Sequence, residues 1–221
     1  MSAKSFVPKL QDHVLTRLSG DAYEGEDREF QCSERNSVRF TSNRLYFHRT
    51  LRVNYTTYDL QRSQDVINPT AHADVMVLSH EDEQDDPHPY WYARVISIFH
   101  VNVYRTPLDG HPGTRPERMD VLWVRWLGRD PEAFGGMKAK RLPKIGFVPF
   151  GDGEPFGFLD PRLVIRGAHI MPAFADGRTT ALLPKSLTRT GQNKREEDES
   201  VHDTDYLNYY VNMCVSWQFV P

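Results

Sequence analysis

Residues 90–103 form the longest apolar run in the chain, and their alternating polarity constrains the fold more than any other stretch. One face carries Trp91, Ala93, Val95, Phe99, Val101 and Val103. The other, mixed face carries Tyr92, Arg94, Ile96, Ile98, His100 and Asn102. A period of two is typical of a β-strand with one face in a core and the other partly wet. Because strands are seldom this long, we expect a bend or bulge near Ser97.

Several other segments are rich in strand-forming residues and predict a sheet around this run. They are residues 50–58, 73–79, 119–127, 141–150, 164–174 and 206–220. We expect residues 90–103 and 120–127 to be antiparallel neighbours, joined by a loop rich in proline and glycine. Residues 38–40 and 45–47 flank a turn and predict a small hairpin. The C-terminal segment is expected to return to the sheet beside residues 51–58.

An amphipathic helix is predicted for residues 5–18. Its apolar face carries Val7, Leu10, Val14 and Leu18, and Gly20 supplies a stop signal. Such a helix can dock toward a preceding domain or pack on its own sheet, and we favour the second interpretation. The predicted organisation is a helix with an acidic connection in residues 1–34, a β-barrel domain in 35–187, a flexible charged loop in 188–205 and a returning strand in 206–221.

Composition excludes several classes of function. The net charge of −3, from 27 basic and 30 acidic residues, gives no electrostatic case for direct binding to nucleic acid or to a membrane. No apolar segment approaches the roughly 20 residues that a membrane helix needs. The two cysteines, Cys32 and Cys214, do not suggest a disulfide framework, and we therefore expect an intracellular protein.

Motifs that carry chemistry are scarce. The sequence has no glycine-rich phosphate loop, no GxSxG elbow and no HExxH pair. An acidic patch of Glu81, Asp82, Glu83, Asp85 and Asp86 lacks the ligand spacing of a calcium loop and is interpreted as a solvated hairpin tip. A zinc site at the flanking His80 and His88 is disfavoured for the same reason, and His169 is interpreted as a core or rim histidine. We therefore predict no catalytic residue, no metal and no cofactor.

A binding site made of aromatic side chains is the more specific hypothesis. Tyr90, Tyr92, Trp123 and Trp126 come from two strands that we expect to be adjacent. Aromatic rings gathered at a barrel mouth can cage a methylated lysine through cation–π contacts. Core packing is the competing explanation and is favoured, because aromatic residues at a period of two usually lie in a core. The acidic patch just before Tyr90 would attract a basic peptide.

The central part of the chain resembles the bromo-adjacent homology (BAH) domain. The matching segments are residues 73–78, 92–98, 124–131 and 164–167, in the order of that family's "YxARIxxI" and "VxWFxRP" strands. Leu127 replaces the usual aromatic residue, and Asp130 intervenes before Pro131. The resemblance implies a chromatin-associated interaction module on a distorted β-barrel without catalysis of its own.

A second resemblance spans nearly the whole chain. Residues 9–18, 52–59, 72–82 and 209–213 are similar to the C-terminal region of uncharacterised proteins of basidiomycete, mushroom-forming fungi, many of them encoded by Plavaka-type DNA transposons. In longer members of that family the transposase core lies upstream of this region. The resemblance therefore implies that the acidic catalytic residues of a transposase are not part of this sequence.

The sequence thus predicts a mainly β fold: a partly open, SH3- or BAH-like antiparallel barrel with an N-terminal helix and an added C-terminal strand. The expected function is a non-catalytic protein- or chromatin-interaction module, the accessory part of a transposon-encoded protein, inside the cell and in the nucleus. One alternative is a hydrolase-like or metal-dependent enzyme domain that uses His169 or the acidic patch. Another is an inactive transposon relic.

Overall fold

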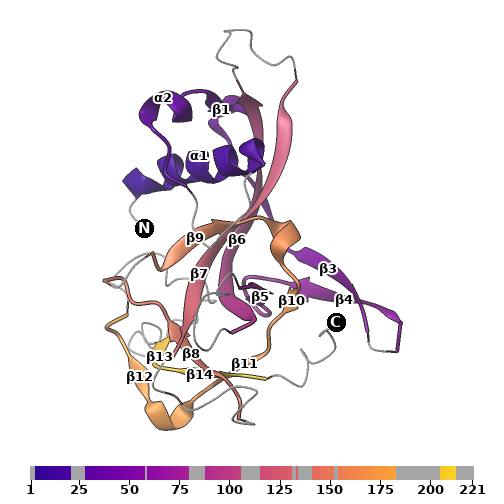
Figure 1. The fold of residues 1–221 in the computed structure, drawn as a ribbon, viewed down its shortest axis with the longest axis vertical. Helices are drawn as coiled ribbons and strands as arrows, with labels where there is room; N and C mark the ends of the chain where they lie inside the picture. Colours follow the sequence, from indigo (N-terminus) through magenta and orange to yellow (C-terminus); the bar gives the residue numbers. More distant parts are fainter. Residues whose placement is uncertain are drawn as a thin grey trace, which may run out of the picture.

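Two long antiparallel strands, β6 (Tyr90–Arg105) and β7 (Glu117–Arg129), run through the whole molecule (Figure 1). The computed structural model describes residues 3–20, 28–57, 59–79, 88–105, 115–130, 133, 141–151, 154–182 and 205–212. Within these residues the fold is mainly β, with a large antiparallel sheet and an N-terminal helix. The predicted pairing of residues 90–103 with 120–127 is confirmed.

The large sheet is built outward from these two strands, with the order β10-β5-β6-β7-β8-β14-β11. The added strands are β5 (Asp74–Leu78), β8 (Lys144–Phe147), β10 (Arg166–Gly167), β11 (Ile170–Pro172) and β14 (Tyr209–Val211). Off this path, β1 (Val38–Phe40) and β2 (Tyr46–His48) pair with β6, and β9 (Phe156–Leu159) pairs with β7. The two long strands therefore have different partners at their two ends.

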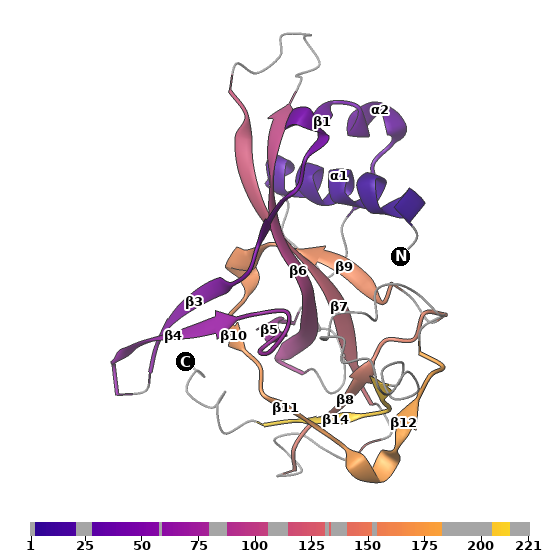
Figure 2. The ribbon, with the colours of Figure 1, turned by 180° about the vertical axis from the view of Figure 1, so that it is seen from behind.

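Two small sheets and several short helices complete the described part. One sheet pairs β3 (Leu51–Thr56) with β4 (Arg62–Ile67), and the other pairs β12 (Arg178–Thr179) with β13 (Asp205–Tyr206). The helices are α1 (Ala3–Ser19), α2 (Cys32–Arg35), η1 (Thr41–Asn43), η2 (Pro161–Leu163) and η3 (Phe174–Asp176). The β3–β4 hairpin projects from the sheet (Figure 2). Asp65 ties it to β10 by accepting a 3.0 Å hydrogen bond from the amide of Gly167.

The bulge expected near Ser97 is present, and it changes which residues share a face. Val95 lies opposite Val124, whereas Ser97 lies opposite Trp123, so Ile96 is an extra residue in β6. One added residue moves every later side chain to the other face of a strand. The single apolar face predicted for residues 91–103 is therefore wrong, because its two halves line cores on opposite faces of the sheet.

Buried side chains form three clusters, and the first two lie on the two faces that the bulge exchanges along β6. The first joins α1 to the later half of β6 and contains Leu10, Val14, Phe99, Val101, Val121 and Phe158. The second lies on the opposite face and contains Val75, Ala93, Val95, Leu122, Val124 and Leu159. The third lies at the other end of the long strands and contains Met76, Tyr92, Leu127, Ile145, Phe147 and Tyr209.

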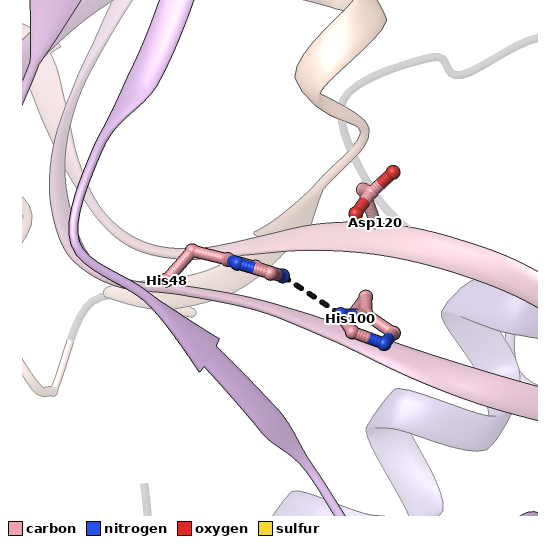
Figure 3. A group of neighbouring side chains, drawn as sticks. All are labelled: His48, His100 and Asp120. Atoms are coloured by element: carbon pink, nitrogen blue, oxygen red, sulfur yellow. Dashed lines mark hydrogen bonds between the residues drawn. The ribbon is translucent and has the colours of Figure 1, made fainter.

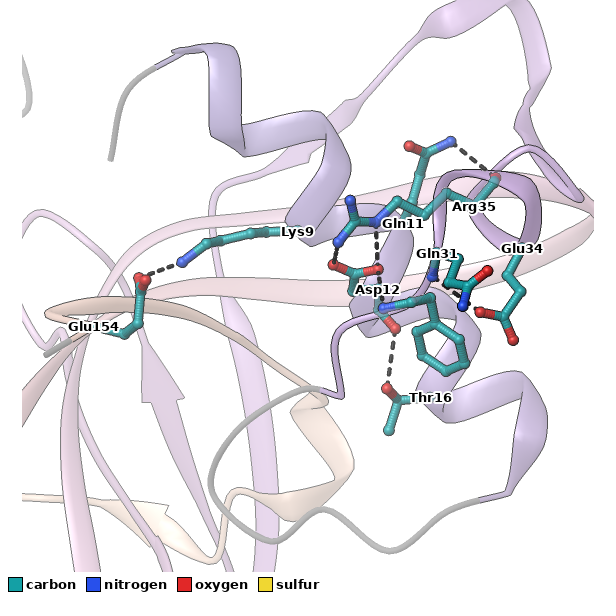
Figure 4. A network of polar contacts seen from close by, with 9 residues as sticks. Lys9, Gln11, Asp12, Thr16, Gln31, Glu34, Arg35 and Glu154 are labelled. Atoms are coloured by element: carbon teal, nitrogen blue, oxygen red, sulfur yellow. Dashed lines mark hydrogen bonds and ion pairs between the residues drawn. The ribbon is translucent and has the colours of Figure 1, made fainter.

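Helix α1 packs on its own sheet, as favoured from the sequence. Leu10 and Val14 are almost fully buried, but Val7 is 50 % exposed, so its assignment to the apolar face is wrong. Figure 4 shows the polar contacts that hold the helix, centred on the buried Asp12. The Asp12 carboxylate accepts hydrogen bonds from Nε and Nη2 of Arg35 at 2.7 and 2.6 Å, and one from the amide of Phe30 at 3.2 Å. Lys9 forms an ion pair with Glu154.

The hairpin predicted for residues 38–47 is not formed. Phe40 lies opposite Val103 and Tyr46 lies opposite His100, so β1 and β2 are two pieces of one edge running along β6. Between them, Ser42 and Asn43 have positive φ angles of 56° and 49°, which make a local bulge and not a chain reversal. The hairpin in this region is instead β3–β4, whose second strand, Arg62–Ile67, is not predicted from the sequence.

The C-terminal strand returns to the sheet, but with different partners from those predicted. β14 pairs with β8 and β11, and not with residues 51–58. Residues 164–174 do not form one strand, because β10 pairs with β5 at one end of the sheet order while β11 pairs with β14 at the other. The acidic patch in 81–86, most of the charged loop in 188–205 and residues 213–221 lie outside the described residues.

Candidate functional site

Three side chains with metal-binding atoms meet on adjacent strands of the sheet. They are His48 on β2, His100 on β6 and Asp120 on β7 (Figure 3). One ligand atom from each lies within 4.8 Å of the other two. Across the described part of the chain, no other group of three or more His, Cys, Asp or Glu residues meets this condition.

The register of the sheet brings these residues together. His100 lies directly opposite Asp120 on β7, and His48 lies opposite Ile98, one diagonal step from His100. Side chains in directly opposed and diagonal positions of an antiparallel pair are within reach of one another. The same period of two that builds the strand places all three side chains on one face.

The two histidines already point at each other. Nε2 of His48 lies 2.7 Å from Nδ1 of His100, and the rings are nearly parallel, with centroids 4.9 Å apart. Tyr46 also stacks with the His100 ring, at 4.7 Å between centroids. A hydrogen bond between two imidazoles needs one proton, and a metal ion needs the lone pairs of both nitrogens. A bound ion would therefore replace the shared proton.

Two arginine side chains contact Asp120, one at its carboxylate and one at its backbone carbonyl. Arg118 donates from Nε and Nη2 to Oδ1 of Asp120, at 3.2 and 2.7 Å. Arg17 of α1 donates to the backbone carbonyl of Asp120 at 2.6 Å and forms a 2.9 Å ion pair with Asp160. Supporting contacts of this kind orient the ligands of a metal site and raise its affinity.

The surroundings of His100 lower its pKa and so favour the neutral imidazole. Burial is the main cause that lowers the pKa of His100, and the positive charge of Arg118 and the neighbouring His48 add to it, against an opposing effect of Asp120. Only the neutral imidazole can donate a lone pair to a metal. The shift therefore favours the form of the side chain that binds metal.

Lowering the pH from about 7.5 to about 5.5, on either side of the ordinary histidine pKa of about 6.5, is expected to destabilise the metal-free protein through His100. The unfolded chain protonates at that ordinary value, whereas folded His100 resists protonation. The contribution of neutral His100 to the free energy of unfolding is complete above the ordinary pKa of the unfolded chain. It is lost as the pH falls through the lower pKa of the folded protein. Urea unfolding at both pH values checks this. His100→Gln should flatten the dependence relative to wild type.

The donor set suits a transition-metal ion. Two imidazole nitrogens and one carboxylate oxygen are typical ligands of zinc, and similar sets bind ferrous iron. Two nitrogens on one tetrahedral zinc, each about 2.0–2.1 Å from the ion, are roughly 3.3 Å apart. The facing nitrogens are now 2.7 Å apart, so the two rings would need to separate and tilt to admit the ion. Three protein ligands would leave one zinc position open.

The residues predicted as an aromatic cage do not come together. Tyr92 is 2 % exposed and belongs to the third cluster, with Tyr90 packed beside it. Trp123 packs on the first cluster and Trp126 on the second, on opposite faces of β7. Tyr92 lies opposite Leu127, four positions along β7 from Trp123, which corresponds to about 13 Å at 3.3 Å per residue. The cage is therefore corrected to core packing. Alternation along β7 puts Trp123 and Trp126 on opposite faces, and the distance along β7 separates Trp123 from Tyr92.

The structure also places His88 and His169, two of the other histidines considered from the sequence. His88 packs its ring against Tyr90 and Tyr92, with centroids 6.5 and 5.7 Å apart. His169 is an exposed rim residue, and its carbonyl accepts a 2.8 Å hydrogen bond from the amide of Asn212. Its ring Nδ1 lies 3.4 Å from the Asn212 side-chain nitrogen, so its ring neighbour is an amide.

Sequence reasoning missed all three residues of the cluster. His48, His100 and Asp120 are separated by 52 and 20 positions, so they form no local motif. The one available signal was the mixed polar face of residues 90–103, on which His100 lies. Finding the other two required the strand register.

Comparisons of the chain with family models, with curated proteins and with solved structures found no match. In the described part of the chain, no helix has the length and apolar character required to cross a membrane.

Proposed function

We propose that this protein is a non-catalytic interaction module that binds one divalent transition-metal ion, zinc first among them, at His48, His100 and Asp120. The observation that carries the proposal is the placement of three ligand atoms from adjacent strands within 4.8 Å of one another. Arg118, which orients Asp120, and the neutral state favoured for His100 support it.

The open coordination position is the point at which a partner would bind. Tyr46 on β2, which is 37 % exposed and stacks on the His100 ring, flanks the cluster with apolar surface. A partner that supplies a histidine or carboxylate to the ion would also cover this ring. The proposed partner is a protein, and the BAH resemblance of residues 73–174 favours a chromatin protein in the nucleus. The separate resemblance of residues 9–18, 52–59, 72–82 and 209–213 to proteins encoded by Plavaka-type transposons favours a transposon-linked origin. The proposed architecture is a partly open SH3- or BAH-like barrel, supported by the different partners of β6 and β7 at their two ends.

Titration of the metal-free protein with Co²⁺ and Zn²⁺ tests the site. Wild type is expected to bind one ion, with the visible absorption of tetrahedral Co²⁺ and its loss when Zn²⁺ is added. His100→Ala should weaken binding by about 100-fold or more, and Arg118→Ala by about tenfold, in line with losses of 10–100-fold for supporting residues. His169→Ala, which removes an exposed histidine elsewhere, is the matched control. Equal affinities of His100→Ala and His169→Ala would contradict the proposal.

A metal-dependent hydrolase is the second candidate, and the open coordination position favours it. Catalytic zinc sites use three protein ligands and a water molecule whose pKa falls to about 7. The zinc-loaded protein can be assayed against p-nitrophenyl acetate and bis(p-nitrophenyl) phosphate. Turnover that is lost in His100→Ala and kept in His169→Ala would favour the hydrolase. Zinc binding without turnover would favour the interaction module.

A further inference from the structure

The guanidinium of Arg125, in the middle of β7, is buried with part of its hydrogen-bonding capacity unused. The residue is 7 % exposed, and its Nη1 donates to Oδ2 of Asp205 at 2.9 Å. Its Nε and Nη2 atoms are also buried and have no hydrogen-bond partner among the described residues. Buried donors of charged groups are nearly always paired, so this edge of the side chain is an exception that calls for a ligand.

Two other arginines of the same chain show what fits such an edge. Nε and Nη2 of Arg35 both donate to the carboxylate of Asp12, at 2.7 and 2.6 Å. The same two atoms of Arg94 donate to the carboxylate of Asp74, at 2.7 and 3.1 Å. The planar fork of a guanidinium matches the two oxygens of a carboxylate, and it binds phosphate in the same way. In Arg125 this fork is empty.

The surroundings of Arg125 favour an anion. Arg94 lies directly opposite on β6, and the guanidinium carbons of Arg94 and Arg125 lie 5.0 and 3.7 Å from the centre of the Phe147 ring. Burial is the largest cause that lowers the pKa of Arg125, and the charge of Arg94 adds to it, against Asp205. On the same face, the buried hydroxyl of Tyr92 also has no hydrogen-bond partner in the described part of the structure. The free polar atoms here can all donate.

We propose that the Nε–Nη2 edge of Arg125 is a binding site for the oxyanion of a small molecule, with a carboxylate as the first choice. The site is separate from the histidine cluster, which lies on the opposite face of the sheet and nearer its other end, so the inference does not depend on metal binding. The two nitrogens are covered, so the anion enters when a neighbouring element opens. Asp205 belongs to β13, whose ladder with β12 has only two residue pairs, and short ladders open locally.

Thermal unfolding in the presence of added anions tests the proposal. Sodium acetate, sodium phosphate and sodium chloride are compared at equal ionic strength, with the full chain. Wild type should unfold at temperatures that rise with the logarithm of the acetate or phosphate concentration, beyond the effect of chloride. Arg125→Lys keeps the charge and loses the fork, and should bind the anion about tenfold more weakly or not at all. Arg35→Lys, whose fork is filled within the chain, should respond like wild type.

A second measurement uses the wild-type protein alone and so does not depend on the folding of a variant. The Nε–H resonance of Arg125 in a ¹H–¹⁵N spectrum should move with acetate or phosphate in a saturable way, and chloride should not move it. A larger response to acetate identifies a carboxylate ligand, and a larger response to phosphate identifies a phosphate ligand. The proposal is overturned if neither anion moves this resonance, or if Arg125→Lys responds to them as wild type does.

Discussion

Replacement of Phe158 by alanine is expected to lower the free energy of unfolding by about 3–5 kcal/mol, as large-to-small changes at buried phenylalanines do. Phe158 is 1 % exposed and lies on β9, between helix α1 and the sheet. Its ring centroid is 5.1 Å from that of Phe6, 6.0 Å from that of His13 and 6.3 Å from that of Phe99. Its loss would leave a cavity where the helix meets the strands.

Urea unfolding followed by circular dichroism measures this effect. Phe158→Leu keeps most of the volume and should lose less than the alanine variant. Phe174→Ala is the matched control, because Phe174 is 74 % exposed and surface changes usually stay within about 0.5 kcal/mol. A loss below 1 kcal/mol in Phe158→Ala would mean that helix α1 does not pack on β9 as described.

Replacement of Asp205 by alanine is expected to cost about 3 kcal/mol, the lower end of the range for removing one partner of a buried ion pair. Asp205 accepts a 2.9 Å hydrogen bond from Arg125, whose side chain is 8 % exposed. The variant would leave this guanidinium buried with no carboxylate. The lower end of the range applies because the side chain of Asp205 is 21 % exposed. Water can therefore take part of the place of the missing carboxylate beside Arg125 in the variant.

A double-mutant cycle separates the ion pair from packing. Arg125→Met keeps much of the apolar stem and removes the charge, so Asp205→Ala in that background should cost far less than in wild type. Denaturant midpoints of the four proteins give the coupling between the two residues. Equal costs of Asp205→Ala in both backgrounds would show that the pair contributes nothing to stability.

The strands were predictable to the extent that their side chains alternate. Residues 90–103 and 119–127 carry long, regular alternations, and the structure has them as β6 and β7 in antiparallel pairing. Helix α1 was also predictable, because apolar spacing is a local signal. Short strands such as β9 and β10 lack such a signal, since two to four residues are too few to show a period.

The candidate site was not predictable for a related reason. A hydrogen-bond register between strands depends on contacts across the sheet, and the order of residues along one strand does not contain it. His48 could be placed beside His100 only once β1 and β2 were known to form one edge along β6. The empty fork of Arg125 likewise depends on the positions of Asp205 and Phe147, both distant in the chain.

By itself the sequence determined that this chain forms long antiparallel strands with an N-terminal helix, because alternation and helical spacing act through neighbouring residues. Only the tertiary structure decided which face each side chain takes, because one extra residue, Ile96, exchanges the two faces of β6 partway along its length. That exchange puts Val95 and Phe99, which share one predicted face, into different clusters and leaves His100 beside Asp120. Faces and registers follow from packing between distant segments, and so do the sites built on them.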